Sequence, residues 1–306
     1  MIFKDLLDQH TRIIRPLFDT LHHLAGENQS HGGDLLLVHQ NASYREEVLT
    51  WDNIPERLSP YTIGTGETGH SALTHHSFIG EYLSKELSSI TLQEYLTKFN
   101  DKSSRGKIEV LEKDESYTIQ SEMLIYLKIW ESDTVIKEFY QITRLVLAEP
   151  FDWHFKVSTY ARDNTATGTR ESILRLMIRD RLKELIPGLY DLLKEIYIPQ
   201  LRNAIAHSQY FIYGRSISLT NYDANNPFSQ IKSIKFDEWI RIFHKSLVLY
   251  TELTRILNQV HVNYSLMAER EGSCQIRVSK EIPNNETEYR ELYYDKVWDT
   301  WNWEKE

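Results

Sequence analysis

The sequence lacks several features that mark specialised protein classes. Cys274 is the only cysteine among the 306 residues, which excludes a disulfide framework and a zinc site built from thiolates. No stretch approaches the roughly 20 apolar residues that cross a bilayer. Residues 1–18 alternate apolar and charged side chains, unlike the unbroken apolar core of a signal peptide. We therefore expect a cytoplasmic protein that does not enter a membrane.

Positive charge is also scarce. The chain has 35 Lys and Arg against 44 Asp and Glu, a net charge of −9, which argues against indiscriminate binding to nucleic acids. The distribution is uneven, because residues 160–215 carry nine basic and six acidic side chains and the parts on either side are acidic. This basic segment is either a site for an anionic ligand or a solvated helix face.

The residues that are present indicate a mainly α protein. The length suffices for one large or two ordinary domains, each with a real core, and apolar residues recur at helical spacing. The expected helices span residues 2–25, 77–99, 120–147, 170–186, 189–209 and 236–262, with a kink at Pro199 and weak helical character over 44–58. We expect hairpins at 210–222 and 274–293, a short strand at 34–39, and loops or linkers at 26–33, 59–76 and 100–107.

The last four expected helices are joined by short connections, which predicts an up-and-down helical bundle with minor β-hairpins. We expect three parts: a mostly helical amino-terminal region of unassigned role over residues 1–115, the bundle over 116–265, and a hairpin with a tail over 266–306.

Two sequence patterns resemble ligand sites but lack the necessary context. "GTGETG" at 64–69 has the glycine spacing of a dinucleotide fingerprint, which requires a strand before it and a helix after it; the proline in the preceding "RLSPYTI" disfavours a strand. Histidines cluster in the first half of the chain, without the tight spacings of a metal site. They are His22, His23, His31, His39, His70, His75 and His76. We interpret these patterns as a glycine loop and as surface histidines, and expect no cofactor and no metal.

The segment "IPQLRNAIAHSQYFIYG", residues 198–214, carries the strongest candidate site. Asn203 and His207 are four residues apart and share a helix face. Arg202 lies about 140 degrees from His207 on an ideal helix, and its long side chain can reach the same space where the helix ends. These residue types suit phosphodiester chemistry, because a histidine can transfer a proton and a guanidinium can hold phosphate oxygens. Alternatively, Arg202 and Asn203 cap or bridge neighbouring helices.

"LRNAIAH" resembles the motif of the HEPN superfamily, in which an arginine and a polar residue precede a histidine late in a helical bundle. The resemblance covers roughly residues 116–265. Arg15 with His22 and Arg255 with His261 have an allowed spacing too, but a proline and an isoleucine follow those arginines. Some members carry a tyrosine two residues after the histidine. Here that position is Gln209, and Tyr210 follows it.

The resemblance implies a metal-independent endoribonuclease that acts on RNA as a homodimer, of the kind found among toxins and phage-defence effectors. His207 would transfer protons, Arg202 would stabilise the phosphorane, and Asn203 would orient one of them. Tyr210, Arg175 and Arg179 are accessory candidates for holding the substrate. The alternative is a non-enzymatic HEPN-like module for dimerisation or interaction, and a neutralising partner protein would suit either role.

Overall fold

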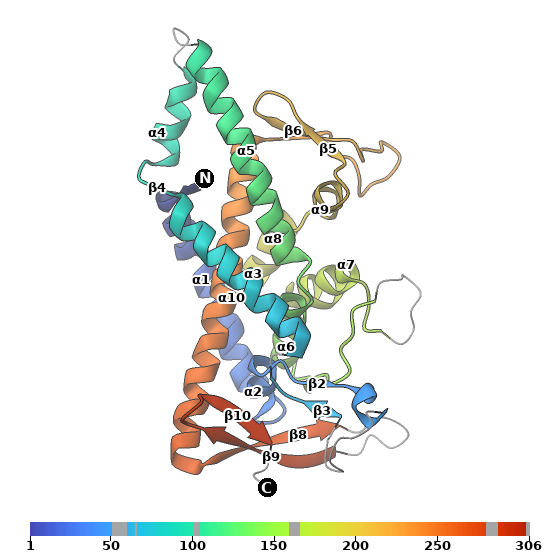
Figure 1. Cartoon of the computed structure of the whole chain (residues 1–306). Coiled ribbons are helices and arrows are strands. Elements are labelled where there is room, and N and C mark those ends of the chain that lie inside the picture. The colour runs from blue at the N-terminus through green and yellow to red at the C-terminus, as the bar shows by residue number, and fades with distance from the viewer. Residues whose placement is uncertain (51–59, 65, 101–104, 159–165, 280–286, 304–306) are drawn as a thin grey trace. The chain divides into compact units, whose positions relative to one another are not determined.

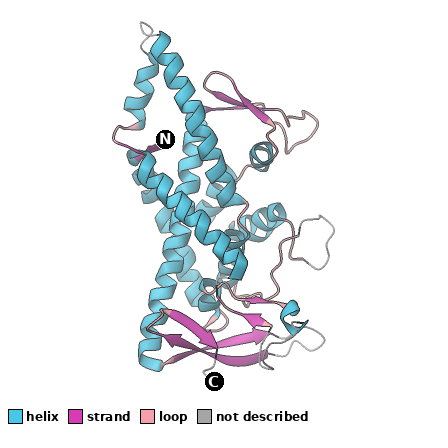
Figure 2. Ribbon diagram, viewed as in Figure 1, coloured by secondary structure: helices cyan, strands magenta, loops and turns pink. Residues whose placement is uncertain are grey.

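The computed structural model describes the whole chain except residues 51–59, 65, 101–104, 159–165, 280–286 and 304–306. The protein is mainly helical with several small sheets (Figures 1 and 2), which confirms the expected class of secondary structure. The chain forms two compact units, each assembled from three separate segments. Unit 1 comprises Met1–Leu17, Leu73–Ser132 and Pro187–Glu252, and unit 2 comprises Phe18–Ala72, Asp133–Ile186 and Leu253–Glu306. The expected boundaries at 115 and 265 do not follow these units and stay a prediction.

Unit 1 is built from helices around a core of aromatic rings. Trp239 packs between Tyr126 and Phe243, with ring centroids 5.6 Å and 5.9 Å away, and Trp130 packs against Tyr197 at 5.2 Å. The unit contains α4 (Leu92–Thr97), α5 (Arg105–Trp130), α8 (Pro187–Ile196), α9 (Pro199–Ala206) and the unit 1 portions of α1 (Lys4–Asn28), α3 (Gly66–Glu86) and α10 (Phe236–Glu271). Burial of such large rings is a main source of stability for this unit.

Two small sheets complete unit 1. Strands β5 (Tyr210–Ile212), β6 (Ser216–Leu219) and β7 (Ser233–Lys235) form an antiparallel sheet in chain order. Strand β1 (Ile2–Phe3) pairs in parallel with β4 (Leu87–Ser88). The hairpin expected over residues 210–222 is therefore confirmed, and a third strand extends it.

Unit 2 combines irregular helices with antiparallel sheets. Its helices are α2 (Asp34–His39), α6 (Asp133–Val146), α7 (Arg170–Ser172) and the unit 2 portions of α1, α3 and α10, with 3-10 turns at η1 (Glu46–Thr50) and η4 (Asp180–Leu182) and a π-helix at η3 (Ile173–Arg179). Its strands are β2 (Ser43–Tyr44), β3 (Tyr61–Thr62), β8 (Ser273–Ser279), β9 (Thr287–Asp295) and β10 (Thr300–Trp303). The hairpin expected over 274–293 is confirmed as β8 and β9, and the Trp-rich tail adds β10.

The helices expected over 120–147 and over 189–209 are each divided. The helix expected over 120–147 ends at Trp130 and restarts at Asp133, because serine and aspartate at 132 and 133 favour a helix start over a helix interior. The helix expected over 189–209 is not kinked at Pro199 but interrupted there. Ile198 is extended, since a residue before proline avoids helical geometry, and Pro199 becomes the first residue of α9.

Three expectations in the first half of the chain are wrong in whole or in part. The strand expected at 34–39 is helix α2, because a buried apolar run as short as this one has no period that separates helix from strand. The loop expected over 59–76 becomes helix from Gly66 onward. The helix expected over 77–99 breaks after Glu86 and restarts as α4, which begins with a capping box formed by Thr91 and Glu94.

Two further expectations are partly met. Within 44–58, η1 is short and residues 51–59 lie outside the described part of the chain, as do residues 101–104 of the expected linker. The helix expected over 170–186 is irregular, since it passes from α to π to 3-10 geometry. Its predicted apolar face is nevertheless buried, and the buried side chains are Leu174, Ile178, Leu182 and Ile186.

Candidate functional site

The two-turn helix α9 carries the RNxxxH motif, and both of its ends are fixed. Ile198 precedes the helix in an extended conformation with φ −108° and ψ 101°. At the other end, the amides of His207 and Gln209 donate to the carbonyls of Asn203 and Ala204 over 3.0 Å and 2.7 Å. Ser208 between them has φ 54°, the left-handed conformation that commonly ends a helix. The motif therefore occupies a defined helix end.

A buried amide ties α9 to the loop between β6 and β7. The Gln200 side chain donates to the carbonyl of Ile231 and accepts from its amide, both over 2.9 Å. Asn221 donates to the carbonyl of Gln200 over 2.9 Å. Because Gln200 is only 3% exposed, these hydrogen bonds are shielded from water, and losing them would leave buried polar groups unsatisfied. The helix and the small sheet are therefore held together next to the motif.

Arg202 is held by a carboxylate. Its Nε atom lies 3.0 Å from Oε1 of Glu131, just after the end of α5, and its side chain is 15% exposed. Both residues belong to unit 1. The break between α5 and α6 positions this carboxylate, so the interrupted helix has a direct consequence for the site. The contact fits the alternative in which Arg202 bridges neighbouring helices, and it also fixes the guanidinium near the end of α5.

His207 and Asn203 differ from Arg202 in their surroundings. His207 is exposed to solvent and Asn203 is half-buried, and neither side chain forms a hydrogen bond to any residue that the structure describes. Tyr210, at the start of β5, is half-buried in the same unit. The motif thus combines a fixed guanidinium with an accessible imidazole, which can exchange protons with solvent or substrate.

The two accessory arginines lie in the other unit. Arg175 forms an ion pair with Glu171 at 2.6 Å, and Arg179 forms one with Asp180 at 2.7 Å. Both arginines lie in the π-helix η3 of unit 2, whereas Arg202, Asn203, His207 and Tyr210 lie in unit 1. Their participation in the same site stays a prediction.

The glycine-rich pattern does not have the parallel sheet that a dinucleotide site uses. Gly66 begins α3, so a helix does follow. The preceding strand β3 has two residues and pairs antiparallel with β2. A fingerprint loop instead joins a strand of a parallel sheet to a helix whose amide groups hold the pyrophosphate.

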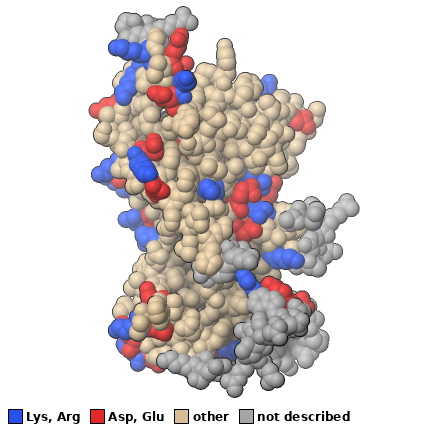
Figure 3. All heavy atoms as spheres, in the orientation of Figure 1, with Lys and Arg blue, Asp and Glu red and all other residues tan. Residues whose placement is uncertain are grey.

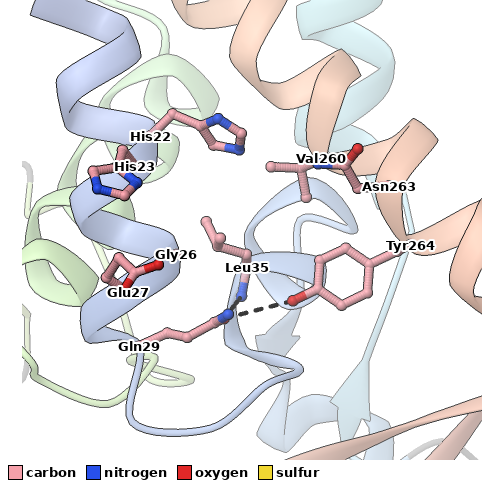
Figure 4. Close-up of a pocket in the computed structure, with 9 residues that line it drawn as sticks. All are labelled: His22, His23, Gly26, Glu27, Gln29, Leu35, Val260, Asn263 and Tyr264. Atoms are coloured by element: carbon pink, nitrogen blue, oxygen red, sulfur yellow. Dashed lines mark hydrogen bonds between the residues drawn. The ribbon is translucent and has the colours of Figure 1, made fainter.

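A separate pocket of about 350 Å³ lies in unit 2 between residues of α1 and α10 (Figure 4). Gln29 accepts hydrogen bonds there from the amide of Leu35 and the hydroxyl of Tyr264. His22 also lines it, and burial together with the positive charge of Arg255 lowers the pKa of this histidine. Within the described residues, no group of three or more His, Cys, Asp or Glu side chains is arranged to hold a metal ion.

Sequence reasoning missed two residues that shape the motif, Glu131 and Gln200. Glu131 lies inside what the periodicity predicts as one continuous helix, so its role depends on a break that apolar spacing does not reveal. The polarity of Gln200 inside an apolar helix is a usable signal, because a buried amide requires partners. Neither partner could be named, since Asn221 and Ile231 are distant in sequence.

No family model matches the chain, and no match is found among curated proteins or solved structures. Among the described residues, no helix is long and apolar enough to span a membrane.

Proposed function

We propose that the protein is a metal-independent endoribonuclease of the HEPN type. The observation that carries this proposal is the end of α9, where an exposed His207 follows Arg202, whose guanidinium is fixed 3.0 Å from Glu131. An accessible proton-transfer group and a positioned cation are the two components that metal-free cleavage of RNA requires. The up-and-down arrangement of the helices around the motif is part of the same proposal.

The proposed reaction uses the ribose 2′-hydroxyl as nucleophile. His207 removes its proton, the oxygen attacks the adjacent phosphorus, and the bond from phosphorus to the 5′-oxygen of the next nucleotide breaks. The products are a 2′,3′-cyclic phosphate and a 5′-hydroxyl, whose proton comes from an imidazolium or from water. Arg202 stabilises the negative charge that grows on the phosphorus oxygens, and Asn203 orients His207 or the phosphate.

The charge of the chain supports the proposed substrate and assembly. A chain with net charge −9 and one basic segment holds a polyanion weakly. Two copies that face each other would double the local positive field, so we propose a homodimer that acts on RNA in the cytoplasm. A toxin or phage-defence role, with a neutralising partner protein, would explain how such an activity is tolerated. Sedimentation at micromolar concentration tests the dimer, and a strict monomer would contradict it.

The alternative function, a non-enzymatic interaction module, is favoured by the same ion pair. Glu131 occupies the charge of Arg202, and the arginine side chain is only 15% exposed. If that contact serves only to join helices, α9 is a structural element, and Arg202→Ala should destabilise the fold without removing an activity.

An RNA-cleavage assay in excess EDTA tests the nuclease proposal. The wild-type protein should cleave RNA, and His207→Ala should lower the rate by about hundredfold or more, the usual range for a general acid or base. His70→Ala is the matched control, because His70 is an exposed histidine outside the motif. Cleavage that disappears in EDTA and returns with magnesium or manganese would reject the assignment of Arg202 and His207 as the catalytic residues. The clustered histidines of the first half of the chain would then be the leading candidates.

A further inference from the structure

The sheet β5–β6–β7 has one buried face and one open face. In its register Ile212, Ile217 and Ile234 lie opposite one another, and Ile217 and Ile234 are 0% and 1% exposed. Phe211, Ser218 and Ser233 lie opposite one another on the other face, because side chains alternate between the two faces of a sheet. One face therefore belongs to the core, and the second carries an aromatic residue with hydroxyl groups.

A second aromatic side chain extends the open face. The Tyr213 amide donates to the carbonyl of Ser216 over 3.1 Å, which continues the pairing of β5 with β6. Tyr213 is two residues beyond Phe211 and therefore lies on the same face, about 7 Å further along the strand. The two rings are 81% and 54% exposed, respectively. Large aromatic surfaces left open side by side on a sheet are unusual unless something binds there.

The chemistry around these rings favours a nucleic acid. Strands β5, β6 and β7 contain no acidic residue, and Lys235 lies opposite Ser216 on the open face. Residues 210–235 carry three cationic side chains against one acidic side chain, in a chain of net charge −9. Figure 3 shows few charged side chains over the region where Figure 1 places β5 and β6. Hydroxyl groups and a lysine beside two rings suit bases and phosphates better than the continuous apolar contact of a protein interface.

The turn between β5 and β6 is anchored. Arg215 forms two hydrogen bonds of 2.8 Å with Glu115 and one of 2.9 Å with Asp237, and its guanidinium lies 4.1 Å from the ring of Phe99. Gly214 beside it has φ 54°, which suits a tight turn. The open face is therefore fixed before any ligand arrives, and a rigid surface loses less entropy on binding.

The open face also lies close to the motif. Phe211 is four residues after His207, so their Cα atoms are at most about 14 Å apart even if the chain between them were fully extended. The Thr220 amide donates to the carbonyl of Gln209 over 2.9 Å, which joins β6 to the segment that follows the motif. A nucleotide bound on the sheet would thus lie within a few nucleotides of the exposed imidazole.

We infer that Phe211 and Tyr213 form a stacking platform for successive bases of single-stranded RNA, with Lys235 and the neighbouring hydroxyl groups contacting its backbone. This inference rests on the proposed nuclease function and adds the form of its substrate. Single strands are the class that fits, because bases must be unpaired to stack on protein side chains.

Fluorescence anisotropy with the full-length His207→Ala protein and a labelled single-stranded oligoribonucleotide of mixed sequence tests the platform. Phe211→Ala and Tyr213→Ala, each added to His207→Ala, should weaken binding by about tenfold, the usual contribution of one stacked base. Phe211→Tyr and Tyr213→Phe, which keep the rings, should restore it. Tyr117→Ala is the matched control, because Tyr117 is a 75% exposed tyrosine on α5 of the same unit. The affinity for a fully paired RNA of the same sequence should be the same for all of these variants.

The outcomes separate the platform from the nuclease. If the protein with an intact motif cleaves RNA but the ring-removing variants bind as tightly as their parent, the platform is rejected and the nuclease stands. If single-stranded RNA binds through the rings but the intact protein never cleaves it, the platform stands and the nuclease fails. Absence of any RNA binding rejects the platform, and so does a change of oligomeric state in the ring-removing variants without RNA binding, which would identify a protein interface. If Phe211→Ala or Tyr213→Ala loses its fold, seen by circular dichroism, the affinities of the parent protein for unpaired and for paired RNA decide, because a charge-only site would bind both alike.

Discussion

Two arginines of unit 1 bind carboxylates in different ways: Arg215 contacts Glu115 within α5, and Arg202 contacts Glu131 just after the end of α5. Arg215 is held by Glu115 and Asp237 together, and the Glu115 side chain is only 4% exposed. Arg202 lies 3.0 Å from the carboxylate of Glu131, whose side chain is 31% exposed. Burial lowers the pKa of Arg215, but the hydrogen bonds that Arg215 donates to Glu115 and the charges of Glu115 and Asp237 outweigh it and raise this pKa. The guanidinium of Arg215 therefore stabilises the fold.

The difference indicates which arginine can take part in chemistry. A cation bound by two carboxylates, one of them buried, has no capacity left for a phosphate, and removing it would strand a buried charge. A cation paired with a partly exposed carboxylate can exchange that partner for a substrate, because Glu131, with 31% of its side chain exposed, can be hydrated when the pair opens. We therefore expect Arg215 to govern stability and Arg202 to govern activity.

The largest expected effect is the loss of cleavage in Arg202→Ala. The rate should fall by about hundredfold or more, since one group that stabilises developing charge usually contributes that much. The free energy of unfolding should fall by about 1 kcal/mol, less than in Arg215→Ala, because the Glu131 that is left behind is 31% exposed and can be hydrated. Cleavage rates and urea unfolding of the same preparation check both statements, with exposed Arg241→Ala as the matched control. If Arg202→Ala cleaves RNA as fast as the wild type, Arg202 does not govern activity, and the proposed difference between the two arginines is wrong.

The next effect is the destabilisation caused by Arg215→Ala. Its loss leaves Glu115 buried without its partner, which should lower the free energy of unfolding by about 3 kcal/mol. Thermal unfolding followed by circular dichroism measures this. Glu115→Gln in the same background should recover part of the loss, because a neutral amide is less costly to bury. If the thermal unfolding midpoint of Arg215→Ala differs little from that of the wild type, the ion pair of Arg215 with Glu115 contributes no more to stability than a surface ion pair.

Acid should separate the two arginine variants further. Burial lowers the pKa of His10 to about 4 and that of His244 to about 3, whereas an unfolded histidine titrates near 6.5. At a pH between the folded and the unfolded pKa of a histidine, the unfolded chain binds more protons than the folded chain. The free energy of unfolding therefore falls as the pH drops below 6.5, by up to about 1.4 kcal/mol per pH unit for each histidine.

Near-ultraviolet circular dichroism against pH checks this dependence. The acid-unfolding midpoint of Arg215→Ala should move to higher pH, because that variant begins with less stability, while the midpoint of Arg202→Ala should stay close to that of the wild type. A stability that is constant between pH 6.5 and 4 would show that neither histidine is buried in neutral form.

The smallest expected effect concerns the carboxylate beside the motif. Glu131→Gln removes the charge that competes with a phosphate for Arg202, so affinity for single-stranded RNA should rise by about threefold, within the range of an exposed ion pair. The comparison requires low salt, because screening weakens every such contact. Weaker binding would indicate that Glu131 orients the guanidinium for substrate, which makes the partner of Arg202 a positioning residue.

The sequence predicts the elements whose signal is local. The period of apolar residues locates α1 and α10, and alternation locates the hairpins that begin at Tyr210 and near Cys274. The helix breaks at Ser132 and Pro199 also have local signals, because serine and proline favour the start of a helix. The long apolar period that runs across both positions predicts continuous helices instead. Helix α2 is too short for any period to identify it.

The partners of the motif depend on tertiary structure and could not be predicted. The chain contains 44 acidic residues, and nothing in their spacing identifies Glu131 as the partner of Arg202 or Glu115 as the partner of Arg215. By contrast, residue types and a position at a helix end indicate the segment that contains Arg202 and His207. The division of the basic segment between two units was not predictable, because it depends on how three distant segments combine in each unit.

The discontinuity of unit 1 has a consequence for synthesis on the ribosome. Its last segment, Pro187–Glu252, contains α9 and the first part of α10, and Asp237 completes the contacts of Arg215. At about 5 to 20 residues per second, the chain spends several seconds with the earlier segments translated and their partners absent. The helix that carries the RNxxxH motif can be tied to its neighbouring strands only after Ile231 has emerged. A nuclease organised in this way would stay inactive until that stage of its own synthesis.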